Sequence, residues 1–102
     1  MADQKPSLAM FTDLYELTMA QVYWQSDVTA PATFSLFIRS YRPDRAYYVL
    51  AGVQDVLEYL EGFEFSEGDI EALRAEGRFA EGFLDFLGQL RFRGGVRAMP
   101  EG

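Results

Sequence analysis

The 102-residue sequence lacks both cysteine and histidine, and each absence removes whole classes of chemistry. Without cysteine, the chain can form no disulfide framework and no thiolate metal site. Without histidine, it can build no Ser-His-Asp triad, no Cys-His pair and no imidazole metal site. It also has no Walker loop and no Gly-x-Gly-x-x-Gly motif. The residues alone therefore predict no catalytic machinery belonging to this chain.

Long apolar runs are also missing from the sequence. The longest are a few residues, far short of the roughly 20 that cross a bilayer. The opening residues, MADQKPS, lack the charged-then-apolar pattern of a secretory signal. Apolar residues nevertheless make up 49% of the sequence and aromatic residues 16%, which argues against disorder. We therefore expect one soluble, cytoplasmic domain with no membrane partner.

Positive charge is scarce, because nine Lys and Arg residues stand against sixteen Asp and Glu, for a net charge of −7. Phosphate contacts need a basic surface, so we expect no nucleic-acid partner. Most of the basic residues gather in two islands, which are Arg39, Arg42 and Arg45, and Arg91, Arg93 and Arg97. Clustered guanidinium groups can bind phosphate or carboxylate. The alternative, which spacing alone favours, is solvated arginines at the ends of strands and turns.

Hydrophobic periodicity and capping residues predict four helices. The first begins at a cap supplied by Thr12 or Asp13 and runs to about Gln25. The second, VQDVLEYLEG, places apolar residues at i, i+3, i+4 and i+7 and stops at Gly62. The third and fourth are expected in SEGDIEALRAEG and FAEGFLDFLGQL.

Three other segments have the apolar alternation or content that is typical of strands. They lie near residues 32–39, 46–51 and 91–99. A Pro-Asp turn in YRPDR separates the first two. The sequence therefore predicts an α+β fold, in which a small antiparallel or mixed sheet is covered by helices.

The first predicted helix carries two apolar stripes. One consists of Met10, Leu14, Leu17 and Trp24, and its neighbour consists of Phe11, Tyr15, Met19, Val22 and Tyr23. One interpretation is a helix buried on all sides in the core of its own domain. The other is that one stripe packs inward while the second meets a partner or a planar ligand. So short a chain has few elements to cover both stripes, which favours the second interpretation.

The segment TDLYELTMAQVYW closely resembles the N-terminal signature of the nicotinate phosphoribosyltransferase family. The likeness continues through ATFSLFIR, YYVLAGVQDVLEYLEGFEFSEGDIEALR and FLDFLGQLRFRGGVRAMPEG. The resemblance implies that residues 1–102 are the N-terminal portion of the family's N-terminal domain. The chain is then expected to be a truncation that lacks the rest of that domain and a large α/β-barrel domain.

The resemblance also implies a reaction, since members transfer a phosphoribosyl group from phosphoribosyl pyrophosphate to nicotinate in NAD salvage. ATP hydrolysis through a phosphorylated histidine drives the transfer, so ATP and Mg are expected for the full-length homodimer and no cofactor for this chain. Tyr15 matches a tyrosine that stacks on nicotinate in the site of the partner subunit. Arg39 matches an arginine that contacts phosphate groups. Asp13 is carried over as a neighbour in the motif, and helix capping is an equal alternative for it.

Two other functional interpretations stay open at this stage. The chain can be a stand-alone binding or interaction module that kept the fold without the chemistry. It can also belong to a nicotinamide-preferring relative. Such enzymes tend to carry a basic residue after the motif tyrosine, where this sequence has Glu16, so nicotinate is favoured.

Overall fold

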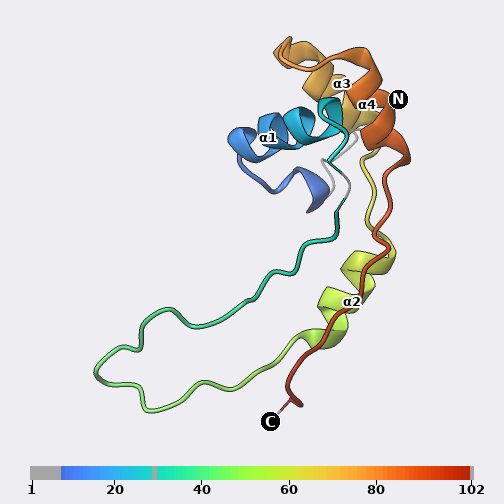
Figure 1. The fold of residues 1–102 in the computed structure, drawn as a ribbon. Helices are drawn as coiled ribbons and strands as arrows, with labels where there is room; N and C mark the ends of the chain where they lie inside the picture. Colours follow the sequence, from blue (N-terminus) through green and yellow to red (C-terminus); the bar gives the residue numbers. More distant parts are fainter. Residues whose placement is uncertain (1–7, 29, 102) are drawn as a thin grey trace.

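The computed structural model describes residues 8–28 and 30–101, and this part of the chain contains helices and extended segments (Figure 1). Residues 1–7, on which the expectation of no secretory signal depends, lie outside the described residues. The helical elements, in chain order, are η1 (Leu8–Met10), α1 (Leu14–Gln25), α2 (Val53–Glu61), α3 (Glu67–Glu76) and α4 (Glu81–Gln89). All four predicted α-helices are therefore confirmed, within a residue or two of their expected ends.

Local capping explains where the helices begin and end. At the start of α3, the Asp69 amide donates to Ser66 Oγ over 3.1 Å, and the Ser66 amide donates to Asp69 Oδ2 over 2.8 Å. These two bonds satisfy amides that a helix start leaves without partners. The same helix ends at Gly77, whose φ of 74° lies in the left-handed region that favours glycine.

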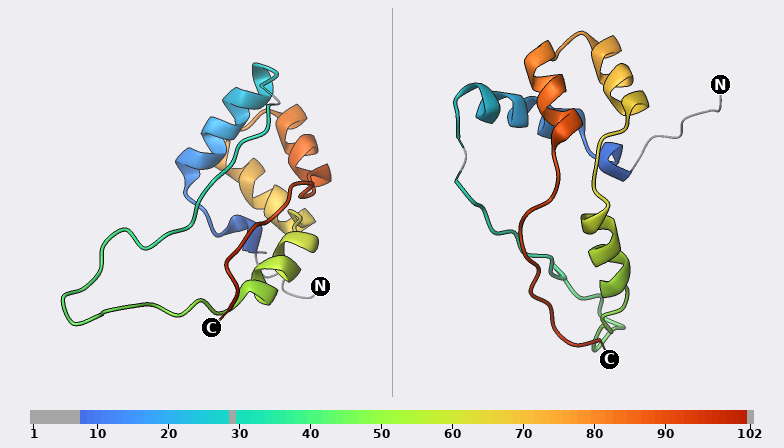
Figure 2. Two further views of the ribbon diagram at one scale, coloured as in Figure 1. Left: turned by 60° about the horizontal axis from the view of Figure 1, so that its bottom comes forward. Right: turned by 90° about the vertical axis from the view of Figure 1, so that its right-hand side faces the viewer.

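A helical cluster, formed by η1, α1, α3 and α4, contains the core (Figure 2). Its buried apolar residues are Ala9, Phe65, Leu73, Phe83, Leu84 and Leu87. Phe83 lies at the centre, with ring contacts to Trp24 of α1, to Phe79 before α4 and to Phe86 of α4. The core therefore joins the first helix to the last two.

Helix α2 lies apart from this cluster, beside the C-terminal segment (Figure 1). Its predicted apolar stripe is only partly covered, since Val53 and Leu60 are half-buried and Val56 and Leu57 are exposed. At its N-terminus, Glu101 Oε2 accepts hydrogen bonds from the amides of Gly52 (2.7 Å) and Val53 (3.3 Å). A carboxylate at this position satisfies free amides and complements the helix dipole. A residue some fifty positions away therefore caps α2.

The predicted α+β fold with a small sheet is wrong for the described residues, which contain four α-helices and no strand. Residues 30–51 instead form a long loop, here called the arm, that extends away from the helical cluster and returns to α2 (Figure 1). The segment near 91–99 is likewise extended without strand pairing. The predicted Pro-Asp turn is confirmed at the tip of the arm, where the Arg45 amide donates to the Arg42 carbonyl over 3.0 Å.

The physical reason for this error is the absence of strand partners. Period-two alternation shows which side chains would share a face, but a ladder needs a second backbone about 4.8 Å away. The two limbs of the arm meet in a ring contact between Tyr41 and Tyr48 but form no strand ladder. The arm's Phe34 and Leu36 are 90% and 99% exposed. The radius of gyration is 16.9 Å, against about 13 Å for a compact domain of this length.

Replacing Phe83 with alanine should lower the free energy of unfolding by about 3–5 kcal/mol, because the fully buried ring fills the centre of the core. Phe34→Ala is the matched control and should change it by less than about 0.5 kcal/mol, since that ring is exposed on the arm. Urea unfolding followed by far-UV circular dichroism measures both values. Equal losses for the two variants would contradict the central place of Phe83.

Candidate functional site

Helix α1 has an inner and an outer face, as the two apolar stripes predicted. At 100° per residue, Leu17, Ala20, Gln21 and Trp24 lie on one side of the helix. Leu17 and Ala20 pack against the core, and Trp24 contacts Phe83. This side is the inner face. Gln21 therefore points toward the cluster.

The outer face of α1 has no cover among the described residues. It carries four large side chains that are all exposed, namely Tyr15, Met19, Val22 and Tyr23. Tyr15 is 56% exposed, so much of its ring is open to solvent. A flat ring with a polar tip on an otherwise apolar face suits contact with another protein or with a planar ligand.

Asp13 is the N-cap residue of α1, which favours the capping interpretation of this motif position. Glu16 Oε1 accepts hydrogen bonds from the Thr12 hydroxyl (2.7 Å) and from the Asp13 amide (3.2 Å). These bonds, the Thr12 bond first, hold the pKa of the Glu16 carboxyl below its ordinary value. The motif residues around Tyr15 therefore fix the beginning of the helix that presents it.

Arg39 lies exposed on the arm, whereas Asp13 and Tyr15 belong to the start of α1. In the described part of the chain, no hydrogen bond or ion pair joins Arg39 to Asp13 or Tyr15. The structure thus brings Asp13 and Tyr15 together on α1 and leaves Arg39 on a separate segment.

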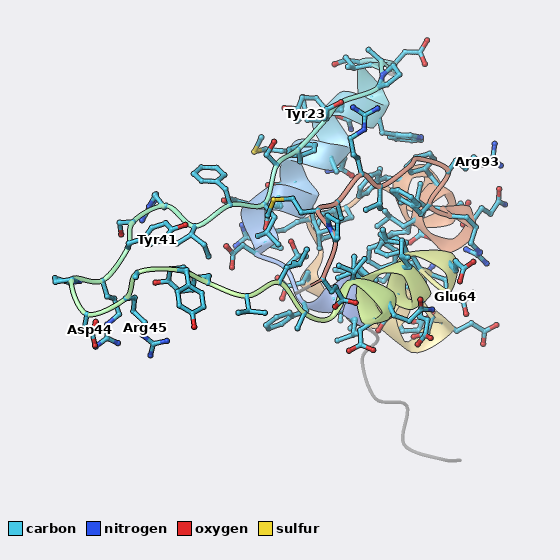
Figure 3. All side chains as sticks on the ribbon, turned by 90° about the horizontal axis from the view of Figure 1, so that it is seen from below. Tyr23, Tyr41, Asp44, Arg45, Glu64 and Arg93 are labelled. Carbon is cyan, nitrogen blue, oxygen red and sulfur yellow. The ribbon has the colours of Figure 1, made fainter. Side chains whose placement is uncertain are left out.

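The two arginine islands are not assembled into one site. Arg45 lies at the tip of the arm, whereas Arg93 lies at the opposite side of the molecule (Figure 3). Within the islands, Arg42 pairs with Asp44 at 3.5 Å and Arg91 pairs with Glu64 at 3.1 Å. One arginine of each island is therefore held in an ion pair with an acidic side chain.

An open cavity of about 500 Å³ lies beside α3 and α4. Apolar Phe65 and Leu84 line it together with Glu71 and Arg74. Arg74 also donates to both carboxylate oxygens of Glu81, over 2.8 and 3.0 Å, and pairs with Glu71. None of the predicted site residues lines this cavity, so it is separate from the candidate site.

Two contacts of the structure were not predicted from the sequence. Gln21 bonds to the backbone of the α3–α4 connection, and Glu101 caps α2. Both contacts join residues about 50 to 60 positions apart, and local patterns carry no information on such pairs.

The described residues contain no group of three or more His, Cys, Asp or Glu side chains that could hold a metal ion. Within the same residues, no helix has the length and apolar content required to cross a membrane.

The comparison with protein families matches residues 10–102 to the nicotinate phosphoribosyltransferase (NAPRTase) N-terminal domain. The chain therefore belongs to the nicotinate phosphoribosyltransferase family, in the part that forms the N-terminal domain. No solved structure matches it.

Individual relatives support this assignment. A nicotinate phosphoribosyltransferase of Mycobacterium tuberculosis is 49% identical over 94 residues, which cover 92% of this chain and 20% of the relative. That of Bacillus subtilis is 38% identical over 97 residues, covering 94% of this chain and 20% of the relative. That of Mus musculus is 33% identical over 97 residues, which cover 91% of this chain and 18% of the relative. The chain thus spans about a fifth of the length of these relatives.

The capping hydrogen bonds should be visible in the titration of Glu16. We expect a pKa below 4.5 for its carboxyl group, because both bonds favour the charged form. Since the folded-state pKa is lowered, these bonds stabilise the start of α1 above pH 4.5 and are lost as the pH falls through the lowered pKa. An NMR titration of the Glu16 carboxyl carbon measures this value.

Thr12→Val removes the larger cause of this shift and should raise the pKa of Glu16 toward its ordinary value. Thr33→Val, on the exposed arm, is the matched control and should leave the titration unchanged. An identical midpoint in the wild type and Thr12→Val would contradict the hydrogen bond between Thr12 and Glu16.

Proposed function

We propose that this chain acts as the N-terminal part of a nicotinate phosphoribosyltransferase, which forms nicotinate mononucleotide and pyrophosphate from nicotinate and phosphoribosyl pyrophosphate. Within that enzyme, α1 presents Tyr15 to the nicotinate ring in the site of a second subunit. The observation that carries this proposal is the exposed Tyr15 on the outer face of a helix whose inner face is packed on the core. The names of the relatives supply the reaction.

The chemical role of Tyr15 is to hold a planar aromatic acid. Offset stacking of two rings contributes about 0.5–1.5 kcal/mol beyond the burial of their area. It also fixes the plane of the nicotinate ring, so that the ring nitrogen faces the sugar carbon it attacks. Asp13 contributes indirectly, since it is the residue at which the helix that carries Tyr15 begins.

The proposed homodimer accounts for the rest of the outer face. Met19, Val22 and Tyr23 surround Tyr15 with exposed apolar surface. Contiguous apolar surface of this kind is typical of protein–protein interfaces, and tyrosine is enriched where such interfaces bind most strongly. A partner subunit would therefore cover the face from which Tyr15 projects.

Arg39 is proposed to contact a phosphate group of phosphoribosyl pyrophosphate. Its guanidinium group can donate two parallel hydrogen bonds to phosphate oxygens. Its exposed position on the arm leaves it accessible to a ligand or to another part of the enzyme.

ATP and Mg are proposed for the full-length enzyme and are assigned to residues outside this chain. The donor set here does not fit either role, because the sequence has no histidine to phosphorylate and the described residues have no carboxylate group of three for a metal. We therefore assign no step through ATP, magnesium or a phosphorylated histidine to this segment.

Tyr15→Ala tests the proposal in a full-length nicotinate phosphoribosyltransferase whose N-terminal segment is this chain. The KM for nicotinate should rise by about 2- to 13-fold from lost stacking alone, while Tyr15→Phe keeps the ring and the low KM. Steady-state kinetics at saturating phosphoribosyl pyrophosphate measure this constant. Tyr47→Ala, an exposed tyrosine on the arm and outside the outer face of α1, is the matched control. A KM that does not change in Tyr15→Ala would overturn the assignment.

Arg39→Ala should raise the KM for phosphoribosyl pyrophosphate by about tenfold or more, since a hydrogen bond to a charged group is worth roughly 1.5–3 kcal/mol. The KM for nicotinate should stay close to the wild-type value. Arg45→Ala, at the tip of the same arm (Figure 3), is the matched control and should have a smaller effect. Equal effects of the two variants would point to general charge instead of a specific phosphate contact.

A further inference from the structure

Gln21 fastens α1 to the connection between α3 and α4 with both ends of its amide group. Its Nε2 donates to the Arg78 carbonyl over 3.1 Å, and its Oε1 accepts from the Ala80 amide over 2.7 Å. The two partners have opposite polarity, so only one orientation of the amide satisfies both. Ala80 is the N-cap of α4 and has no side-chain acceptor of its own. Gln21 therefore fixes the position of α1 along the backbone of residues 78–80.

Trp24, one turn further along the same face, makes the second contact. Its ring lies 5.8 Å from that of Phe83, and it closely approaches the backbone of α4 at Gly82. A Cβ atom at Gly82 would lie 2.9 Å from Trp24 Cη2, closer than real contacts of this kind. The absence of a side chain at this position is thus required for the ring to lie where it does.

These contacts set the direction in which Tyr15 points. Tyr15 precedes Gln21 by six residues, which is about 9 Å along the helix axis, and lies on the opposite face. A helix is rigid over this distance. If α1 rotates about its axis or slides along the core, Tyr15 on the outer face therefore moves with it. The hydrophobic contacts of Leu17 and Ala20 alone are non-directional and leave such movements possible.

We propose that Gln21 and Trp24 are positioning residues for Tyr15: they hold α1 in a single rotation and register on the start of α4. This inference rests on the proposed function, because the position matters for catalysis only if Tyr15 meets nicotinate. The clamp, meaning the contacts of Gln21 and Trp24 with residues 78–83, is a separate physical device that can be tested without substrate.

Gly82→Ala tests the clamp without removing any hydrogen bond. The new methyl group displaces the Trp24 ring, while alanine favours the helical conformation of α4 and keeps the chain folded. Gly88→Ala is the matched control, since it adds the same group to the same helix where nothing lies within 4 Å. Trp24 is the sole tryptophan of the chain. Its emission should shift to longer wavelength and its quenching by acrylamide should increase in Gly82→Ala and not in Gly88→Ala.

Gln21→Ala removes the directional contact instead, with Gln25→Ala, an exposed glutamine on the same helix, as its control. In the full-length enzyme, Gly82→Ala and Gln21→Ala should raise the KM for nicotinate by an amount up to the roughly 2- to 13-fold effect of Tyr15→Ala. The KM for phosphoribosyl pyrophosphate should not change. A variant that merely damaged the fold would alter both constants.

The results separate this inference from the proposed function. If Tyr15→Ala raises the KM but Gly82→Ala and Gln21→Ala do not, the positioning role is overturned and the proposed function stands. Unchanged Trp24 quenching in both clamp variants also overturns it, because the contacts then do not hold α1. If Tyr15→Ala has no effect, the proposed function fails and takes the positioning role with it. Selective loss of nicotinate affinity together with increased quenching supports both.

Discussion

The packing of Phe83 is the interaction on which the rest of the described structure depends. Its ring is fully buried and meets aromatic side chains from α1, from α4 and from the connection before α4. Through Trp24 it joins the first helix to a helix some sixty residues later, and no other ring contact does so among the described residues. The small core, the division of α1 into two faces and the exposure of Tyr15 all follow from this contact.

The sequence was sufficient to predict elements whose signals are local. Helix α3 is an example, because its capping residues lie within a dozen positions of one another. Ser66 and Asp69 cap its beginning, and Gly77 caps its end. The apolar face of α4 was likewise readable, and Phe83, Leu84 and Leu87 are buried as their spacing indicates. In the candidate site, the motif around Tyr15 could be recognised, and the capping by Asp13 and Glu16 was visible in their spacing.

Features that depend on distant residues could not be predicted in this way. The alternation in ATFSLFIR suggested a strand, yet alternation specifies a face and does not provide the neighbouring backbone that makes a strand. The side-chain amide of Gln21 satisfies the backbone of a turn 57 and 59 positions away, which no local pattern around Gln21 indicates. Glu101 could not be linked to α2 for the same reason. The direction of Tyr15 is also of this kind, since it depends on what lies beneath the helix.

The arm gives the chain regions of very unequal local stability. Its backbone runs from residue 30 to residue 51 through solvent, whereas the cluster is held by packing between residues that precede the arm and residues that follow it. Amide protons of the arm therefore exchange almost as fast as those of an unfolded peptide, and a protease meets this segment first. A single cut there separates α1 from α3 and α4 in the covalent chain but not in space. Because Trp24 contacts Phe83, we expect the two pieces to stay associated as a complex of two complementary fragments.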